Sequence, residues 1–394
     1  DTRFLAQTAI YARERGFMKD MPALLCAILA KRDVDLLKAV FPRVIDNGKM
    51  LRNFVQIIRS GKAGKKSLAS APKTLVKNWL ESRDDKRLLE ASIGNDPSLA
   101  DVIKMAHPKP ESESRSAFYG YLLGREYDKR KLPEIVKQYE AYKAGETKEV
   151  PDVPFQLLTA LQLGKKEWTE IAKNMKWHAT RMNLNTLKRH GVLEDKAMVR
   201  LIADRLRDAE QIQKVKVFPY QLLAAYLNVI DMPSEITEAL QDAMEISLEN
   251  VPEVNGKVWI FPDVSGSMSS PLTGNRGTAT SKVRCIDIAA LVAAAFIRKN
   301  KGSGVIPFET GVCPISINPR DSVMTNAKKL ASIGGGGTNC SAPLAELNRR
   351  GESGDLIIYV SDNESWVDSS QYLSLIHISE PTRLRRISYA VFCL

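Results

Sequence analysis

The sequence predicts a multidomain protein of the α plus α/β class, in which a helical half precedes an α/β domain. At 394 residues the chain is long enough for two or more domains. Through residues 1–250, apolar side chains recur at helical spacing with little strand character. After residue 254, two apolar runs typical of buried strands each end at an aspartate. We therefore expect one domain over 1–250 and a second over 254–372.

Short amphipathic segments make up the helical half. Breakers such as Met21-Pro22, Asn47-Gly48 and Phe218-Pro219 separate these segments. About ten short helices of this kind fit an α-solenoid of stacked, HEAT-like helical pairs. The sequence contains no repeat strict enough to assign a period. Such arrays curve and present an extended concave surface to ligands.

Positive charge is concentrated in two parts of the helical half, and the whole chain has a formal net charge of +11. From Gly48 to Leu80 there are eight Lys or Arg and no acid, and from Ile171 to Leu193 there are five and no acid. The second run also contains Trp177, His178, Asn183, Asn185 and His190. One such run is more often a solvated face. Two runs that include aromatic and amide side chains suit phosphate contact and base stacking.

Composition places the chain among ordinary globular proteins, with 44% hydrophobic and 26% charged residues. Its five cysteines show neither a CxxC pair nor metal-site spacing, which is typical of reduced thiols. No segment reaches the roughly 18 apolar residues of a membrane span. We therefore expect a cytoplasmic location and no membrane partner.

The sequence pattern predicts the order of strands and helices in the α/β domain. We expect a strand over 258–262, a helix over 281–299, a strand over 304–308, an edge strand over 312–317 that Pro314 interrupts, a helix ending at 330, a helix over 343–349 and a strand over 355–362. Asp321 or Ser322 is expected to cap the helix that ends at 330. Apolar and small residues on the helix over 281–299 predict a face packed closely on the sheet.

Side chains that carry oxygen follow the strand ends of this domain. In chain order they are Asp263, Ser265, Ser267, Thr338 and Asp362. The carboxyl edge of an open α/β sheet is where such folds place ligands. Hard oxygen donors without His or Cys suit Mg²⁺ or Mn²⁺ better than zinc. Each piece alone is explained by an ordinary Ser/Gly turn or Gly-rich hinge, but the three segments together favour a metal site.

This donor order resembles the metal-ion-dependent adhesion site of von Willebrand factor A domains. The match consists of Asp-x-Ser-x-Ser from Asp263, then Thr338 after four glycines, then Asp362 at a strand end. The resemblance implies that Ser265, Ser267 and Thr338 hold the ion, with Asp263 and Asp362 acting directly or through water. It also implies one coordination position left open for a partner's carboxylate.

The helical half resembles the TROVE module of the Ro autoantigen, or Ro ribonucleoprotein, family. The matching stretches are Ser98 to Pro110, which includes Ala-His-Pro-Lys-Pro, Arg181 to Gly191, and Val217 to Tyr226. TROVE followed by a von Willebrand A domain is that family's arrangement, and the likeness extends from Thr2 to about Tyr372. It implies a ring of HEAT-like helical repeats followed by a Rossmann-like A domain that closes it.

The resemblance implies a non-enzymatic RNA-binding protein. Members of the family bind Y RNAs on an outer basic surface, and 3′ ends of misfolded or structured non-coding RNA in a central hole, for RNA quality control or processing. This further implies a monomer within a ribonucleoprotein and a protein partner such as an exoribonuclease or helicase. The candidate RNA-binding residues are Lys73, Lys77, Lys104, His107, Lys109, Arg181, Lys188 and Arg189. His107 matches a family position at the RNA surface; a capping role before Pro108 is the alternative.

Two other functions remain open. A metal-dependent interaction scaffold of the adhesion or chelatase type explains the A domain but leaves the basic helical half unexplained. A metal-dependent phosphoryl-transfer enzyme is less favoured, because an aspartyl-phosphate enzyme would want a second carboxylate where Ser265 stands.

Residues 373–394 are expected to lie outside the native fold. The stretch that begins at Leu373 and reads Leu-Ser-Leu-Ile-His-Ile-Ser-Glu-Pro-Thr-Arg resembles a translated sequencing adapter. A genuine last helix and strand is the alternative. We also expect the A domain to be truncated and the true N-terminus to precede Asp1, which is not a methionine.

Overall fold

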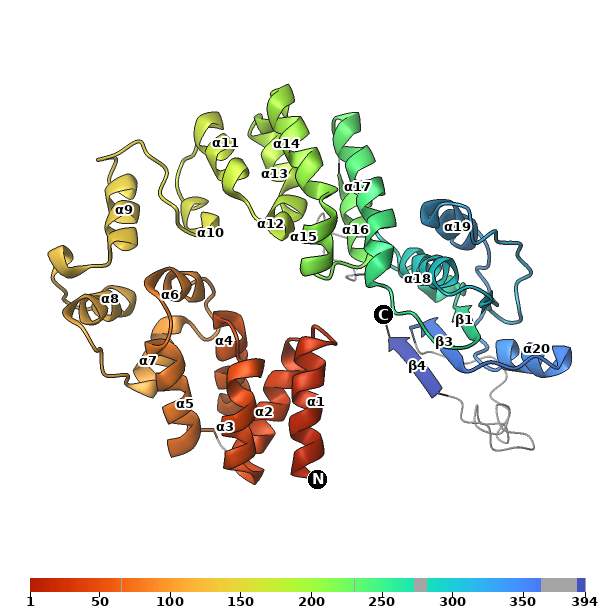
Figure 1. Cartoon of the computed structure of the whole chain (residues 1–394), viewed down its shortest axis with the longest axis horizontal. Helices are drawn as coiled ribbons and strands as arrows, with labels where there is room; N and C mark the ends of the chain where they lie inside the picture. Colours follow the sequence, from red (N-terminus) through yellow and green to blue (C-terminus); the bar gives the residue numbers. More distant parts are fainter. Residues whose placement is uncertain (65, 230, 273–281, 363–387, 394) are drawn as a thin grey trace. The chain divides into compact units, whose positions relative to one another are not determined.

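The computed structural model describes residues 1–64, 66–229, 231–272, 282–362 and 388–393 (Figure 1). The chain divides into two compact units, Asp1–Glu167 and Trp168–Leu394. Each unit is described by itself below. The boundary predicted between 250 and 254 falls inside the second unit and stays a prediction.

The first unit is an array of short amphipathic helices. They are α1 (Thr2–Glu14), α2 (Asp20–Arg32), α3 (Val34–Val44), α4 (Gly48–Arg59), α5 (Ser70–Glu81), α6 (Asp85–Ala91), α7 (Leu99–Ala106), α8 (Glu113–Leu123), η1 (Lys129–Lys131), α9 (Glu134–Lys143) and α10 (Phe155–Leu158). Side chains at the N-termini cap several of them; Asn47, for example, accepts a hydrogen bond from the Met50 N–H at the start of α4. Consecutive helices pack on one another, as α2 does on α1, α3 and α4.

The unit boundary falls within α11 (Lys165–Asn174), and the helical pattern continues into the second unit. There it comprises α12 (Trp177–Met182), α13 (Leu184–Arg189), η2 (Val192–Glu194), α14 (Lys196–Leu206), α15 (Ala209–Lys214), α16 (Pro219–Asn228), α17 (Ser234–Ile246) and η3 (Ser247–Asn250). The described residues before the sheet thus form seventeen α-helices instead of about ten. Four of them, α10, α12, α13 and α15, have four to six residues, too few to show a helical repeat of apolar residues.

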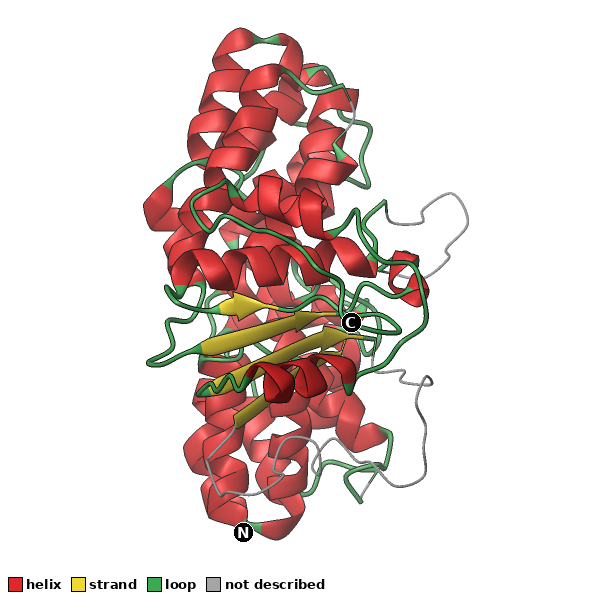
Figure 2. Ribbon diagram, turned by 90° about the vertical axis from the view of Figure 1, so that its right-hand side faces the viewer, coloured by secondary structure: helices red, strands yellow, loops and turns green. Residues whose placement is uncertain are grey.

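A parallel four-stranded sheet follows in the order β2-β1-β3-β4. The strands are β1 (Val258–Pro262), β2 (Gly304–Val305), β3 (Leu356–Ser361) and β4 (Ser388–Cys393). Figure 2 shows them side by side and pointing the same way. The helices of this part are η4 (Gly266–Ser269), α18 (Cys285–Lys299), α19 (Val323–Leu330) and α20 (Ala342–Arg350). This is the α/β architecture that the sequence predicts.

Both faces of the sheet are covered. On one face Trp259, Phe261, Ile357 and Tyr359 pack with Leu344 and Leu347 of α20 and with Ile306 and Phe308. The rings of Phe261 and Tyr359 meet edge to face with centroids 5.0 Å apart. Helix α18 packs against β1, β2 and β3. Because alternate strand residues point to opposite faces, Val258 and Ile260 turn toward this second layer.

The region of the second and fourth predicted strands differs from expectation. Pairing continues past β2, since the N–H groups of Ile306 and Phe308 donate to the carbonyls of Ile260 and Pro262. Strand β2 itself ends at Val305; the nitrogen of Pro307, between these two donors, faces away from β1, so its missing N–H removes no bond to β1. The edge strand predicted over 312–317 is wrong: only an isolated bridge joins Val312 to Phe308, and proline at 314 prevents a continuous ladder.

Strand β4 also departs from expectation. The sequence analysis leaves 373–394 out of the fold, but Ser388–Cys393 pair in parallel with Leu356–Ser361 of β3. The segment is rich in residues that favour strands, and it extends the sheet beyond β3. Leaving these six residues out of the sheet was therefore wrong. Their adapter-like origin stays a prediction, and residues 373–387 lie outside the described part.

The last helical repeats are joined to the α/β part within the second unit. The Glu245 carboxylate of α17 accepts a hydrogen bond of 3.0 Å from the Val323 N–H, at the N-terminus of α19. A negative charge is favourable at this end of a helix. Lys299 of α18 forms an ion pair of 2.9 Å with Glu249. These contacts connect helices α17 and η3 directly to the layer that covers the sheet.

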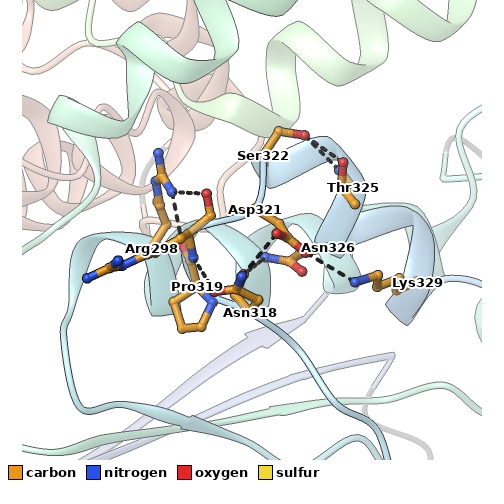
Figure 3. Close-up of polar contacts among 9 residues, drawn as sticks. Arg298, Asn318, Pro319, Asp321, Ser322, Thr325, Asn326 and Lys329 are labelled. Carbon is orange, nitrogen blue, oxygen red and sulfur yellow. Dashed lines mark hydrogen bonds and ion pairs between the residues drawn. The ribbon is translucent and has the colours of Figure 1, made fainter.

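A polar cluster fixes the loop that leads into α19 (Figure 3). Arg298, in the last turn of α18, donates to the carbonyls of Pro319 and Arg320 at 3.1 and 2.7 Å. Asn326 donates to the Asn318 carbonyl at 2.8 Å. The Ser322 side chain accepts from the Thr325 N–H, which confirms the predicted cap. None of the described helices has both the length and the apolar character needed to cross a membrane.

Candidate metal centre and basic surface

Asp263 lies at the carboxyl end of β1 and is fully buried. Its N–H donates to the Val360 carbonyl of β3 at 2.9 Å. One carboxylate oxygen accepts from the Ser265 N–H at 2.9 Å, and the other accepts from the Ser361 hydroxyl at 2.7 Å. These bonds hold the carboxylate at the sheet edge and turn the chain so that Ser265 follows closely.

The two serines of the motif converge. Their hydroxyl oxygens are 3.2 Å apart, and the Met268 N–H donates to the Ser265 carbonyl at 3.2 Å within η4. Ser265 is buried, whereas Ser267 is exposed. The pair therefore offers two oxygen donors at one place, one inside the domain and one accessible from outside.

The loop that carries Thr338 lies against the Asp-x-Ser-x-Ser turn. Gly266 N–H donates to the Gly336 carbonyl at 2.9 Å, and Gly335 N–H donates to the Val264 carbonyl at 2.9 Å. At Gly334, φ is +87° and a Cβ would stand 2.1 Å from the Val264 carbonyl oxygen, so that only glycine fits. Thr338 itself is 1% exposed. The structure thus brings the Thr338 loop beside the two serines.

Asp362 follows β3 and is half-buried. Burial raises the pKa of Asp263, and the nearby Asp362 charge adds to this effect, while hydrogen bonds from Ser265 and Ser361 oppose it. Burial likewise raises the pKa of the Cys285 thiol at the start of α18, again with a contribution from Asp362. Asp362 therefore lies close enough to Asp263 for its negative charge to disfavour ionisation of Asp263.

This donor set fits a hard divalent cation. Within the described ranges there is no group of three or more His, Cys, Asp or Glu side chains placed to hold a metal. The site instead combines two carboxylates with hydroxyl oxygens, and a divalent ion would favour the ionised form of the buried Asp263. Mg²⁺ and Mn²⁺ accept such oxygen ligands, whereas zinc prefers nitrogen and sulfur.

Two residues at this edge were not predicted. The Ser361 hydroxyl bonds Asp263, and the Glu309 carboxylate accepts from the Gly336 N–H at 2.7 Å. The pairing of Pro262 with Val360 places Ser361 beside Asp263, and only the strand register reveals this. Glu309 follows an irregular stretch of chain, and no motif in the sequence marks it.

Predicted RNA-contact residues of the first unit lie on two neighbouring helices. Lys73 and Lys77 are one turn apart on α5, Lys104 is exposed on α7, and these helices pack together. His107 ends α7 in a left-handed conformation with φ of 53°, and its Nδ1 lies 3.3 Å from the Met105 carbonyl oxygen. Both His107 and Lys109 are exposed. His107 therefore occupies the C-terminal capping position of α7 and is also accessible to a ligand, so the two roles considered for it do not exclude each other.

The first basic run is acid-free in sequence, and its described cations also lack acidic partners in space. Elsewhere in the first unit some cations are neutralised, as in Arg13 with Asp46 at 2.7 Å and Arg43 with Glu14 at 2.7 Å, and others form no ion pair with a described acid. In the described part of the acid-free run 48–80, no lysine or arginine forms an ion pair with a described acid. Arg52 is half-buried and donates to the Ala91 carbonyl, but the described lysines of the run are left for a partner, or for solvent.

Arg181 does not lie where the sequence predicts. It is only 8% exposed, and its guanidinium donates to the Gln221 carbonyl of α16 at 2.6 Å. A second contact of 3.3 Å reaches the Met182 sulfur. Burial lowers the pKa of Arg181. Arg181 therefore connects α12 to α16 from inside the unit, and the structure gives no surface from which it could contact RNA.

Other members of the second basic run also have structural partners. Lys188 donates to the Asp231 carbonyl at 2.7 Å, and Trp177 is buried with its Nε1 donating to the Leu206 carbonyl at 3.1 Å. His190 stacks on the buried Trp168 with ring centroids 4.5 Å apart. Arg189 is exposed. The interpretation of this run as a base-stacking surface therefore loses Trp177, whereas His178 is exposed.

Substitutions at Arg181 should separate a structural role from an RNA-binding one. We expect Arg181→Glu to lower the free energy of unfolding by about 3 kcal/mol, because it buries a carboxylate beside a carbonyl oxygen. Arg181→Met keeps the volume without a charge and should cost within about 1 kcal/mol. Urea denaturation measures both, with the exposed Arg189→Met as the control. Equal, negligible effects of all three variants would contradict this assignment.

A parallel sheet with an oxygen-rich carboxyl edge, joined to helical repeats, defines the class: a helical array that carries an A-type α/β domain. Comparison with known proteins agrees with this class. Residues 257–376 match the family model of the Ro60 vWA domain. A curated relative, "RNA-binding protein RO60" of Deinococcus radiodurans, is 24% identical over 293 residues, which cover 68% of this chain and 54% of the relative. The chain thus spans about half the length of that relative.

A solved structure extends the likeness to most of the chain. The crystal structure of the Deinococcus radiodurans RO (RSR) protein matches with a TM-score of 0.66 and 21% identity, covering 94% of this chain and 79% of that one. At this identity the match establishes the fold. Together the findings show that the chain is similar to Ro proteins: residues 257–376 match the Ro60 vWA domain, and most of the chain shares the fold of the RO (RSR) protein.

Proposed function

We propose that this chain binds RNA, and that the lysines of α5 and α7 supply part of the contact. The observation that carries the proposal is the acid-free run 48–80, which forms no ion pair within the described part of the chain, followed by exposed Lys104 and Lys109. Unneutralised cations on neighbouring helices suit a phosphate backbone. The relative named an RNA-binding protein supports the same function.

The RNA that we propose is a small, structured, non-coding one, either Y-like or a misfolded RNA with a free 3′ end. Lysines read phosphate position rather than base identity, so shape and single-stranded ends would set the specificity. We further propose a non-enzymatic, monomeric, cytoplasmic protein that presents its RNA to an exoribonuclease or helicase. The ring and central hole stay predictions that rest on the family resemblance.

We also propose that the sheet edge holds Mg²⁺ or Mn²⁺. The ligands would be Ser265, Ser267 and Thr338, with Asp263 and Asp362 acting directly or through water. The ion would supply positive charge between three loops and a coordination position for a partner's acidic group. The chain's own residues prepare this site, because Ser361 and the Ser265 N–H orient the Asp263 carboxylate.

A metal-dependent protein-interaction scaffold is a second candidate function. The exposure of Ser267 beside the buried Ser265 favours it, because an acidic side chain of a partner could reach the site from outside. The unpaired lysines of the first unit have no role in this function. It therefore accounts for less of the chain than RNA binding does.

Filter binding of the full chain to a structured RNA with a single-stranded 3′ tail tests the proposal. We expect affinity to fall by a factor of about 1,000 between 50 and 200 mM salt, as for proteins with several phosphate contacts. Loss of binding on removal of the tail would support recognition of the 3′ end, and unchanged binding would support recognition of the folded RNA surface. Absence of binding at low salt would overturn RNA binding in favour of the scaffold.

A further inference from the structure

The turn formed by Glu309 and Thr310 contacts the glycine-rich loop through three hydrogen bonds. The Glu309 carboxylate accepts from the Gly336 N–H at 2.7 Å, and the Thr310 hydroxyl accepts from the Gly337 N–H at 2.9 Å. The Glu309 carbonyl accepts from the Asn339 N–H at 2.7 Å. The bonds to residues 337 and 339 lie on either side of Thr338.

The loop needs such contacts because its sequence does not fix its conformation. Four consecutive glycines, 334–337, lose more conformational entropy on ordering than any other residues would. The sheet edge holds the loop through one donor, the Gly335 N–H to Val264, and one acceptor, the Gly336 carbonyl from Gly266. Among the described residues, the other backbone hydrogen bonds of the 336–339 segment go to the turn, apart from the local bond between the Ala342 N–H and the Asn339 carbonyl.

The Glu309 carboxylate approaches the backbone at Gly336 closely. A Cβ at Gly336 would stand 2.9 Å from the Glu309 carboxylate carbon. The turn is itself closed by the Glu309 N–H, which donates to the Gly311 carbonyl at 2.8 Å. A hydrogen bond to an ionised carboxylate is stronger than one between neutral groups. Glu309 therefore holds the glycine-rich loop in place through a direct, charge-assisted hydrogen bond.

We infer that Glu309 and Thr310 are positioning residues for the candidate metal site, because they fix the loop that presents Thr338. This inference rests on the proposed metal site. Without the hydrogen bonds to Glu309 and Thr310, binding of the ion would have to order the four glycines as well as form the bonds between the ion and its ligands. The turn orders the loop before the ion binds, so less conformational entropy is lost on binding. This raises the affinity for the ion without adding a ligand.

Three variants of the full chain test the inference by calorimetric titration with Mg²⁺ and Mn²⁺. Glu309→Ala should weaken binding about tenfold, because a charge-assisted bond to the loop is lost. Glu309→Gln keeps an acceptor for the Gly336 N–H and should lose no more than about threefold. Thr310→Val removes the other side-chain acceptor and should lie between these two. Glu253→Ala is the matched control, since Glu253 is exposed and its loss changes the net charge equally.

A second readout does not need the ion. Without added metal, amide hydrogen exchange of the 334–339 segment should be about tenfold faster in Glu309→Ala than in Glu309→Gln or the control. Equal weakening by Ala and Gln would assign the effect to charge and overturn the positioning role. Unchanged metal affinity and unchanged amide exchange in Glu309→Ala, together with loss of metal binding in Asp263→Asn, would also overturn the positioning role. Failure of the unchanged chain to bind either ion would instead overturn the metal site, and the inference with it.

Discussion

Reversing the charge of Lys73, Lys77 and Lys104 to glutamate is expected to weaken binding of structured RNA about 100-fold at 0.15 M salt. The three lysines lie on the packed helices α5 and α7; none is within ion-pair distance of a described acid, and the charge of Lys104 helps to lower the pKa of the nearby Asp101. Each reversal removes one released counterion and adds repulsion toward phosphate. The slope of log affinity against log salt should therefore become shallower by about two to three. Filter binding across a salt series measures both quantities.

The control for this triple variant must change net charge equally. Suitable positions are Lys38, Lys143 and Lys173, each of which pairs with an acid three residues earlier. Reversal there should change affinity less than about threefold, because these lysines are partly neutralised already. Equal losses in the two triple variants would mean that overall charge, and not the α5–α7 surface, attracts the RNA. Circular dichroism confirms that both variants remain folded.

The elements that sequence patterns predicted best are those with a strong local signal. The run Val258–Pro262 is apolar and short, and it forms β1 within the bounds expected. Ser322 caps α19 because a serine side chain bonds a backbone donor three residues on. Short helices such as α10, with four residues, carry no full period and could not be counted from apolar spacing.

Errors at the candidate sites came from burial, which a single sequence does not report. Arg181 lies in an acid-free run, and its interior position depends on a carbonyl forty residues away, that of Gln221. Trp177 was expected near bases for the same reason, but its ring is 1% exposed. Asp263 could be located because its motif is local and directly follows a strand. Glu309 could not, because its bond to Gly336 spans 27 residues and depends on the path of an irregular loop.

Changing Asp263 to asparagine is expected to abolish stabilisation of the chain by Mg²⁺. The amide preserves both existing bonds in kind: its oxygen can accept from the Ser265 N–H, and its nitrogen can donate to the Ser361 hydroxyl oxygen. What it removes is the charge. At 100 times the dissociation constant an ion stabilises a folded protein by about 2.7 kcal/mol, and the variant should lose this gain. Thermal unfolding with and without Mg²⁺ measures the difference.

Asp355→Asn is the matched control, because that carboxylate also accepts a backbone hydrogen bond, from the Lys257 N–H at 2.7 Å, but precedes β3 at the opposite edge of the sheet. The control should keep the full Mg²⁺ response. Without the ion, Asp263→Asn should be at least as stable as the unchanged chain, since it removes a buried charge that burial and Asp362 disfavour. A Mg²⁺ response that survives in Asp263→Asn would place the ion elsewhere. A lower stability without the ion would mean that the carboxylate acts chiefly as a structural acceptor at the sheet edge.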